Sequence, residues 1–276
     1  MYWTDAHAHI WTPDTNSYPV THDIYGDQRV PRDFTPEVLL RHSRPSGVGR
    51  FVLVQPDRYG TDNRYILDSV ERFPAFFRAV VSVDPELAVN AGDMQVLLKR
   101  GVVGLHIVAP SQGMGESEGG LNYDTVFGVA AEVGYAICIR TRPGGLSDVV
   151  RMCSKHRDTV AVLDHRALIE ESCSLDGEEM QAIISLSELP RAYIKVFGLH
   201  VQRQKKPPEN ELVLMIKNLV HVFGSERIMW GSDSPYQLMK EDYGNSISLI
   251  RDRLDFLDEA DRQQVLSGTA DKIFFS

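Results

Sequence analysis

Short apolar runs rich in β-branched and aromatic residues alternate with amphipathic stretches along almost the whole chain. The apolar runs are continuous rather than alternating, which is typical of strands buried on both faces of a sheet. This pattern predicts eight strands, within residues 2–10, 50–56, 77–85, 101–110, 135–143, 158–165, 191–200 and 226–236.

Stretches with helical spacing separate nearly all of these predicted strands. Thr35 followed by Pro36 indicates a helix start, because proline is favoured at the first helical position. Ser147 is similarly placed to cap a helix, whereas the polar, proline-containing residues 12–33 predict a long loop. We expect helices within residues 35–44, 63–73, 93–101, 123–134, 146–156, 177–189, 209–224, 247–256 and 259–266.

Regular alternation of strands and helices favours a parallel sheet in an α/β fold. Eight such units in 276 residues match the size of a (β/α)8 TIM barrel. No internal repeat or linker marks a boundary, so we predict a single barrel domain over residues 1–276. An open doubly wound sheet is the alternative. No G-x-G-x-x-G follows the first predicted strand, which argues against the dinucleotide-binding version of that fold.

The composition is that of an ordinary globular protein, with 43% hydrophobic and 24% charged residues. The formal net charge of −9 disfavours a nucleic-acid partner, because an acidic surface repels phosphate backbones. No apolar run approaches the roughly 20 residues that cross a bilayer, and no signal peptide is visible. The cysteines Cys138, Cys153 and Cys173 form neither a zinc-type pair nor a disulfide framework. We therefore expect a cytoplasmic protein without a membrane partner.

Charged and imidazole side chains stand at the ends of several predicted strands, where a barrel carries its chemistry. His7 and His9 lie two residues apart, which on a strand places both on one face, roughly 6.5–7 Å apart along the backbone. His165 ends the sixth predicted strand and Asp233 the eighth. We predict these four residues as catalytic, with substrate-binding positions at Arg58, Tyr59, Asn63, His106, Arg140, Arg142 and Arg166.

Each position also has a structural interpretation. Asp233, within "SDSP", is placed to cap a helix, and His165 could bond to backbone. Lys195 is interpreted as a partner for a carboxylate inside the barrel. Asp5 is interpreted as a support for the histidines rather than as a reacting group.

The stretches "DAHAHIW", "VLDH" and "MWGSDSPY" resemble motifs of the amidohydrolase superfamily. Together with "VQPDRYGTDNRYILD" and "GTADKIFF", they resemble more narrowly its amidohydrolase-2 branch, which contains sugar-acid lactonases and 2-pyrone-4,6-dicarboxylate lactonase. The motifs occur in the expected order over residues 5–275. The resemblance implies a barrel that acts as a lactonase-like hydrolase.

Position by position, the resemblance implies that His7 and His9 are metal or substrate histidines, that His165 is the sixth-strand histidine and that Asp233 activates water. Arg140 stands where metal-dependent members carry a fifth-strand histidine, and the strand-four residue that bridges two metals is missing. A two-metal site is therefore not expected. Two alternatives stay open. The site either holds one divalent ion, zinc by preference, on His7, His9 and Asp233, with or without His165, or it is metal-free.

The expected reaction is hydrolysis of a lactone or a related ester or amide bond. Asp233 would take a proton from the attacking water, while the histidines would stabilise the developing oxyanion directly or through a metal. Arginine side chains bind carboxylates in a bidentate way, so arginines at the rim predict a small anionic substrate, such as a carboxylated lactone or sugar acid.

Three alternatives stay open at this point. A metal-dependent decarboxylase of the same branch would need a tightly held metal, which the absent fifth-strand histidine disfavours. A TatD-type nuclease shares the first and last motifs, but the acidic net charge argues against it. A non-catalytic barrel that binds a sugar acid would not require the set formed by His7, His9, His165 and Asp233. A homodimer is compatible with the sequence.

Overall fold

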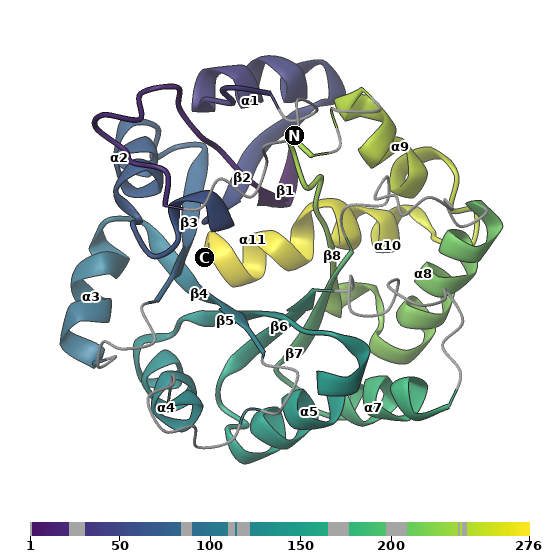
Figure 1. Ribbon diagram of the computed structural model, residues 1–276. Helices are drawn as coiled ribbons and strands as arrows, with labels where there is room; N and C mark the ends of the chain where they lie inside the picture. The colour runs from purple at the N-terminus through teal and green to yellow at the C-terminus, as the bar shows by residue number, and fades with distance from the viewer. Residues whose placement is uncertain are drawn as a thin grey trace.

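The computed structural model describes residues 2–21, 31–83, 90–109, 114, 122–164, 177–196, 209–236, 238 and 242–276. Eight strands in this part of the chain form one parallel sheet in which each strand pairs with the next in the sequence. This order confirms the predicted single-domain (β/α)8 barrel, with the helices arranged around the strands (Figure 1). The strands are β1 (Trp3–Ala8), β2 (Val48–Val54), β3 (Phe77–Ser82), β4 (Val102–Val108), β5 (Ala136–Arg140), β6 (Val160–Asp164), β7 (Ala192–Val196) and β8 (Ile228–Trp230).

Helices follow the strands in turn, and most of them bury apolar residues, as α2 does with Ile66, Leu67 and Val70. Their ends use the expected local chemistry: the Asn90 side chain accepts a hydrogen bond from the Asp93 N–H at the start of α3, and α4 ends at Gly134 in the left-handed conformation, with φ 85°. The helices are α1 (Pro36–Ser43), α2 (Arg64–Arg72), α3 (Ala91–Lys99), α4 (Tyr123–Val133), α5 (Leu146–Lys155), α7 (Glu178–Ser187), α8 (Glu209–Phe223), α9 (Tyr243–Asp252), α10 (Glu259–Gln263) and α11 (Thr269–Phe274).

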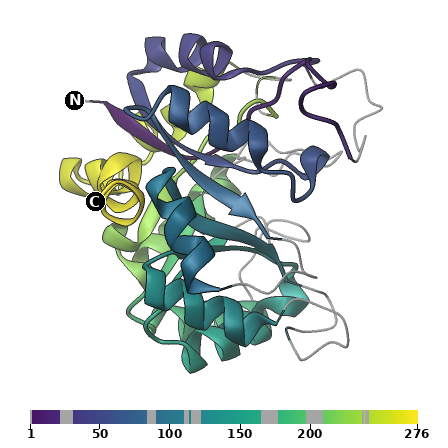
Figure 2. The same ribbon diagram turned by 90° about the vertical axis from the view of Figure 1, so that its left-hand side faces the viewer.

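The buried apolar residues form two clusters, one between strands and helices and one inside the barrel. The inner cluster includes Val54, Val162 and Met229 from the strands, together with Ala270 and Phe274 from α11. Figure 2 shows α11 and the N-terminus at the same end of the barrel, with the strands running away from it. Because α11 covers the end where the strands begin, the polar side chains at the opposite ends of the strands are left to form a site.

The barrel closes where the segment after β8 runs along β1. Ala8 and Ser234 form a parallel bridge. The His9 N–H donates to the Ser234 carbonyl at 2.7 Å, and the Asp233 N–H donates to the His7 carbonyl at 2.8 Å. These two hydrogen bonds place the residues of the first and last motifs side by side.

Most predicted elements are present, with four differences. The helix expected over 247–256 is α9, which begins at Tyr243 and ends at Asp252. The eighth strand is only Ile228–Trp230, because the chain beyond it pairs with β1 through one bridge, Ala8 to Ser234, rather than a continuous ladder. The predicted cap at Ser147 is wrong: the helix begins at Leu146 after Gly145, so Ser147 lies within its first turn. The helix expected over 259–266 is α10, and a π-helical turn, Gln264–Gly268, joins it to α11.

Four predicted strands and the predicted loop extend beyond the described residues. The parts that lie outside are residues 84–85, 110, 165 and 197–200 of the third, fourth, sixth and seventh predicted strands and residues 22–30 of the loop. Among the helices of the described part, none is both long and apolar enough to span a membrane.

Gly231 provides a test of the closure. A Cβ built on Gly231 would lie 2.7 Å from the His7 Cβ and 2.9 Å from the His7 N. We expect Gly231→Ala to lower the free energy of unfolding by about 1–3 kcal/mol, because backbone atoms must move to relieve the overlap. Urea denaturation measures this change.

The matched control is Gly128→Ala in α4, where an added Cβ meets nothing within 4 Å. That substitution should raise stability by about 0.5–1 kcal/mol, since alanine is preferred in a helix interior. Equal effects of the two substitutions would contradict a tight contact between Gly231 and β1.

Candidate active site

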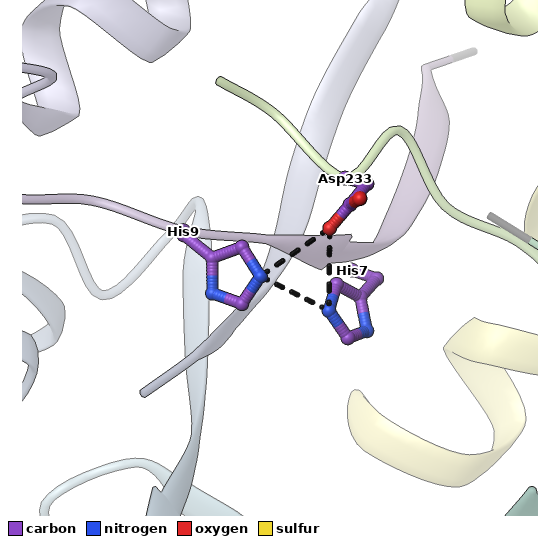
Figure 3. Close-up of side chains that lie close together, drawn as sticks. All are labelled: His7, His9 and Asp233. Carbon is purple, nitrogen blue, oxygen red and sulfur yellow. Dashed lines mark hydrogen bonds and ion pairs between the residues drawn. The ribbon is translucent and has the colours of Figure 1, made fainter. Parts of the chain in front are cut away.

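Three ionisable side chains meet at the carboxyl ends of β1 and β8. His9 Nε2 lies 3.1 Å from His7 Nε2 and 3.4 Å from Asp233 Oδ1, and His7 Nε2 lies 3.8 Å from the same oxygen. The imidazoles and the carboxylate face one another in Figure 3, and all three residues are buried. The structure thus brings together three of the four predicted catalytic residues. The fourth, His165, lies outside the described residues.

The backbone of Asp233 has an unusual conformation. Its φ is 61°, in the left-handed region that non-glycine residues seldom adopt. Its N–H donates to His7, and its carbonyl accepts a hydrogen bond from the Tyr236 N–H at 3.0 Å. The turn is therefore held on both sides, which is the situation in which uncommon backbone conformations occur at functional sites.

Asp5 connects the two strands beneath the site. Its carboxylate accepts hydrogen bonds from the Ser232 N–H at 2.8 Å, the Ser232 hydroxyl at 2.5 Å, the His7 N–H at 3.0 Å and the Tyr243 hydroxyl at 2.6 Å. Burial raises the pKa of Asp5, and these hydrogen bonds oppose the rise. Asp5 thus supports the histidine-bearing strand, in line with the interpretation made from the sequence.

The orientation of His9 is set by the backbone. Its Nδ1 lies 2.8 Å from the Val54 carbonyl oxygen, which can only accept, so Nδ1 carries the proton of the neutral ring. The lone pair is then on Nε2, the atom that faces His7 and Asp233. A ring nitrogen bonded to backbone while its other nitrogen points into a site is the usual arrangement of a metal-ligating histidine.

The three side chains have the donor set for one divalent ion. One ligand atom from each of His7, His9 and Asp233 lies within 4.8 Å of the others. The lone pair of His9 Nε2 faces the Asp233 Oδ1, so two acceptors oppose each other, and Asp233 Oδ2 is buried with no hydrogen-bond partner among the described residues. A cation or a proton between these atoms would satisfy them, so the residues fit a bound metal.

Arg140, the last residue of β5, forms an ion pair with Asp57. Its two terminal nitrogens donate to the same oxygen, Asp57 Oδ2, at 3.0 and 3.1 Å. Burial raises the pKa of Asp57, but the Arg140 guanidinium outweighs burial and leaves this pKa below its usual value. The pair is half-exposed, so it is open to solvent at the strand ends.

His106 projects from β4 and is buried. Burial, with the nearby Arg140 charge acting in the same direction, lowers the pKa of His106 to about 3. Its Nε2 lies 4.0 Å from the Asp164 Oδ2. At neutral pH His106 is therefore an uncharged ring that can donate or accept a hydrogen bond without adding charge to the site.

Two of the predicted substrate-binding residues brace loops in the structure. The Tyr59 hydroxyl accepts a hydrogen bond from the Thr12 N–H at 3.1 Å, and the residue is only 1% exposed. The Asn63 amide donates to the Ser82 carbonyl at 2.8 Å and accepts from the Ser82 N–H at 3.1 Å. Both side chains thus use their polar atoms on backbone groups.

The other predicted arginines differ in their surroundings. Arg58 is half-buried, and its guanidinium lies 5.1 Å from the centre of the Trp11 ring. Arg142 is exposed just beyond β5, and Arg166 lies outside the described residues.

From the sequence we interpret Lys195 only as a partner for a carboxylate inside the barrel, and the structure also places it against His7. Lys195 lies in β7 with 0% exposure, and its Nζ is 3.5 Å from His7 Nδ1. A lysine in the middle of the apolar run "AYIKV" was the available signal, because a strand buried on both faces has no solvent for an ammonium group.

The sequence model of the amidohydrolase family matches residues 4–275, and the chain therefore belongs to that family. It is 26% identical over 235 residues to 4-sulfomuconolactone hydrolase from Hydrogenophaga intermedia, a match that covers 84% of this chain and 74% of that protein. It is also 26% identical over 276 residues to D-galactarolactone isomerase from Agrobacterium fabrum, covering 98% of this chain and 90% of that protein.

The fold is shared with solved amidohydrolases. One is a zinc-bound amidohydrolase from Burkholderia multivorans, which superposes with a TM-score of 0.79 at 22% sequence identity and covers 100% of this chain and 99% of its own. This similarity shows that the two proteins share the barrel fold.

The low pKa of His106 predicts a pH dependence of stability. The unfolded chain takes up a proton on this residue near pH 6.5, whereas the folded chain does so only near pH 3. Stability from this residue is complete above pH 6.5 and is lost as the pH falls, by about 2 kcal/mol between pH 6.5 and 5. His106→Gln should lack this loss in urea denaturation at pH 7 and pH 5.

The control His42→Gln removes an exposed histidine of α1. If His106→Gln and wild type lose stability equally, the assignment of a neutral buried ring is wrong.

Proposed function

We propose that this protein hydrolyses the lactone ring of a small anionic substrate, with Asp233 accepting the proton of the attacking water. The buried Asp233 carboxylate carries this proposal. One of its oxygens faces the two imidazoles, and the other is buried without a hydrogen-bond partner among the described residues. Such an oxygen can accept a proton from a water molecule that is itself close to the histidines.

The bond changes follow from this placement. The water oxygen bonds to the lactone carbonyl carbon while Asp233 takes the water proton. The ring carbon–oxygen bond then breaks, and the same proton returns to the leaving ring oxygen, giving a hydroxy acid. His7 is close enough to Asp233 to contact the same carbonyl, where a ring N–H would stabilise the developing oxyanion, whereas the lone pair of His9 Nε2 would contribute through a bound ion.

The names of the curated relatives support a lactone substrate. One acts on a sulfomuconolactone and the other on a galactarolactone. Both names describe lactones of acids, which agrees with the arginines expected around the mouth. No residue contact specifically favours the decarboxylase alternative or a non-catalytic barrel.

One divalent ion is part of the proposal, held by His7, His9 and Asp233. Two imidazoles and one carboxylate are ligands that zinc accepts, and zinc is present in the related amidohydrolase from Burkholderia multivorans. When bound, such an ion would polarise the carbonyl and lower the pKa of water. Arg140 occupies the end of β5, so the chain offers no fifth-strand histidine for a second ion.

We assign the binding of the substrate's anionic group to Arg140. Both of its terminal nitrogens contact a single oxygen of Asp57, so the guanidinium fork does not make the paired contacts that a carboxylate prefers. A substrate carboxylate could take up such contacts. Arg58, Arg142 and Arg166 stay predicted binding positions, and a cytoplasmic location and a homodimer stay predictions.

Asp233→Asn tests the proton acceptor. The amide is of similar size but cannot accept the proton, so we expect kcat to fall by about 10²- to 10⁴-fold. Activity is measured with a pH indicator on a panel of carboxylated and sugar-acid lactones, since ring opening releases acid. Asp252→Asn, at an exposed ion pair of α9, is the control and should leave kcat unchanged. Near-normal turnover by Asp233→Asn with intact circular dichroism would exclude Asp233 as the base.

Arg140→Gln tests the anion site. Loss of a charged hydrogen bond should reduce kcat/KM for a carboxylated lactone by about 10- to 100-fold, mainly through KM. The value for an uncharged lactone of the same ring size should change little. Arg251→Gln, from a surface pair with Asp252, is the matched control. An equal loss for charged and uncharged lactones would mean that Arg140 supports the fold rather than the substrate.

A further inference from the structure

Lys195 lies inside the barrel, directly below the predicted metal-binding residues. Its Nζ is 3.5 Å from His7 Nδ1, 3.7 Å from Cys138 Sγ and 5.7 Å from the centre of the Phe274 ring. The residue has 0% exposure. A buried ammonium is costly unless nearby groups compensate its charge, so its position requires an explanation.

The neighbouring strand supplies a compensating carboxylate. Asp164 of β6 is the register partner of Lys195, and register partners in parallel strands point to the same face of the sheet. Asp164 is 1% exposed. Burial raises the pKa of the Cys138 thiol to about 11, so that thiol stays neutral beside the ammonium. Lys195 therefore lies beside a carboxyl side chain and a neutral thiol.

The ammonium decides which nitrogen of His7 carries a proton. An ammonium group can only donate, so His7 Nδ1 must accept, and the proton of the neutral His7 ring lies on Nε2. His7 Nε2 faces His9 Nε2 at 3.1 Å, and His9 donates through its own Nδ1 to Val54. A chain of donors then runs from Lys195 through His7 to His9 and the Val54 carbonyl, with a donor and an acceptor at each contact.

This arrangement opposes metal binding at His7. A divalent ion needs a lone pair on His7 Nε2, so the ring proton would have to lie on Nδ1, where it would face the donor Lys195. The positive charge of the ammonium also disfavours a second cation nearby. We infer that Lys195 is a positioning residue that holds the proton of His7 on Nε2 and thereby weakens the affinity of the His7–His9–Asp233 site for divalent metal. Lys195 thus affects what fraction of the protein holds an ion at this site.

Zinc affinity tests this inference without any substrate, so it is independent of the proposed lactone hydrolysis. Zn²⁺ alone is titrated into the full-length protein in competition with a chromophoric chelator. Lys195→Met removes the charge and the donor, and it should bind Zn²⁺ about 10- to 100-fold more tightly, the size of effect that a change in the outer partner of a ligating histidine produces. Lys195→Arg keeps both properties and should match the wild type.

Lys155→Met is the matched control, since it removes the same charge from an exposed site on α5. It should leave the affinity for Zn²⁺ unchanged. An affinity of Lys195→Met equal to or weaker than that of the wild type, in a protein with wild-type circular dichroism, would overturn the inference. An equal gain in Lys155→Met would also overturn it, because net charge alone would then explain the effect.

A second measurement uses the wild-type protein and does not depend on whether a variant folds. Long-range proton–nitrogen spectra of protein labelled with ¹⁵N-histidine distinguish a ring protonated on Nε2 from one protonated on Nδ1. The His7 signals are identified by their loss in His7→Asn. We expect the Nε2-protonated form in metal-free protein. The Nδ1-protonated form there would contradict the inference.

Discussion

The contact between the first strand and the segment after the last strand is the constraint on which the site depends. Two backbone hydrogen bonds join them, from Asp233 to the His7 carbonyl and from His9 to the Ser234 carbonyl. The Asp5 carboxylate adds bonds to Ser232, 227 residues away in the sequence. These bonds close the barrel and also position the three ionisable side chains. The geometry of the site is therefore a consequence of the closure.

The fold could be predicted from the sequence because the same pattern of apolar and amphipathic stretches recurs along the chain. Continuous apolar runs separated by amphipathic stretches predict a parallel sheet covered by helices, and eight units allow few arrangements. The pairing of His7 and His9 with Asp233 was also predictable, since carboxyl ends of parallel strands converge. The ends of elements were harder to predict. Ser147 has the right residue type for a cap, but the helix begins at Leu146, so the cap position falls on Gly145.

The roles of single polar residues were predictable only in part. Tyr59 and Asn63 follow a strand, as substrate-binding residues would, yet their polar atoms bond to the backbone of Thr12 and Ser82. A sequence pattern does not distinguish a side chain that braces a loop from one that lines the mouth, because both types occur at strand ends. The contact of Lys195 with His7 joins residues 188 positions apart in the sequence, and no local periodicity predicts it.

The buried carboxylates of the barrel repel an anionic substrate, so binding such a substrate requires positive charge at the site. Among the described residues, the carboxylates of Asp5, Asp164 and Asp233 are buried in the barrel, with the ammonium of Lys195 among them. Ordinary ionisation of these groups would leave an excess of negative charge that repels an incoming anion. The half-exposed Arg140 provides positive charge at the strand ends. A proton or a metal ion at Asp233 would reduce the excess of negative charge further. The charge that makes Asp233 a base therefore also creates the need for a cation beside it, and Lys195 and a bound metal are two ways to meet that need at the same pair of histidines.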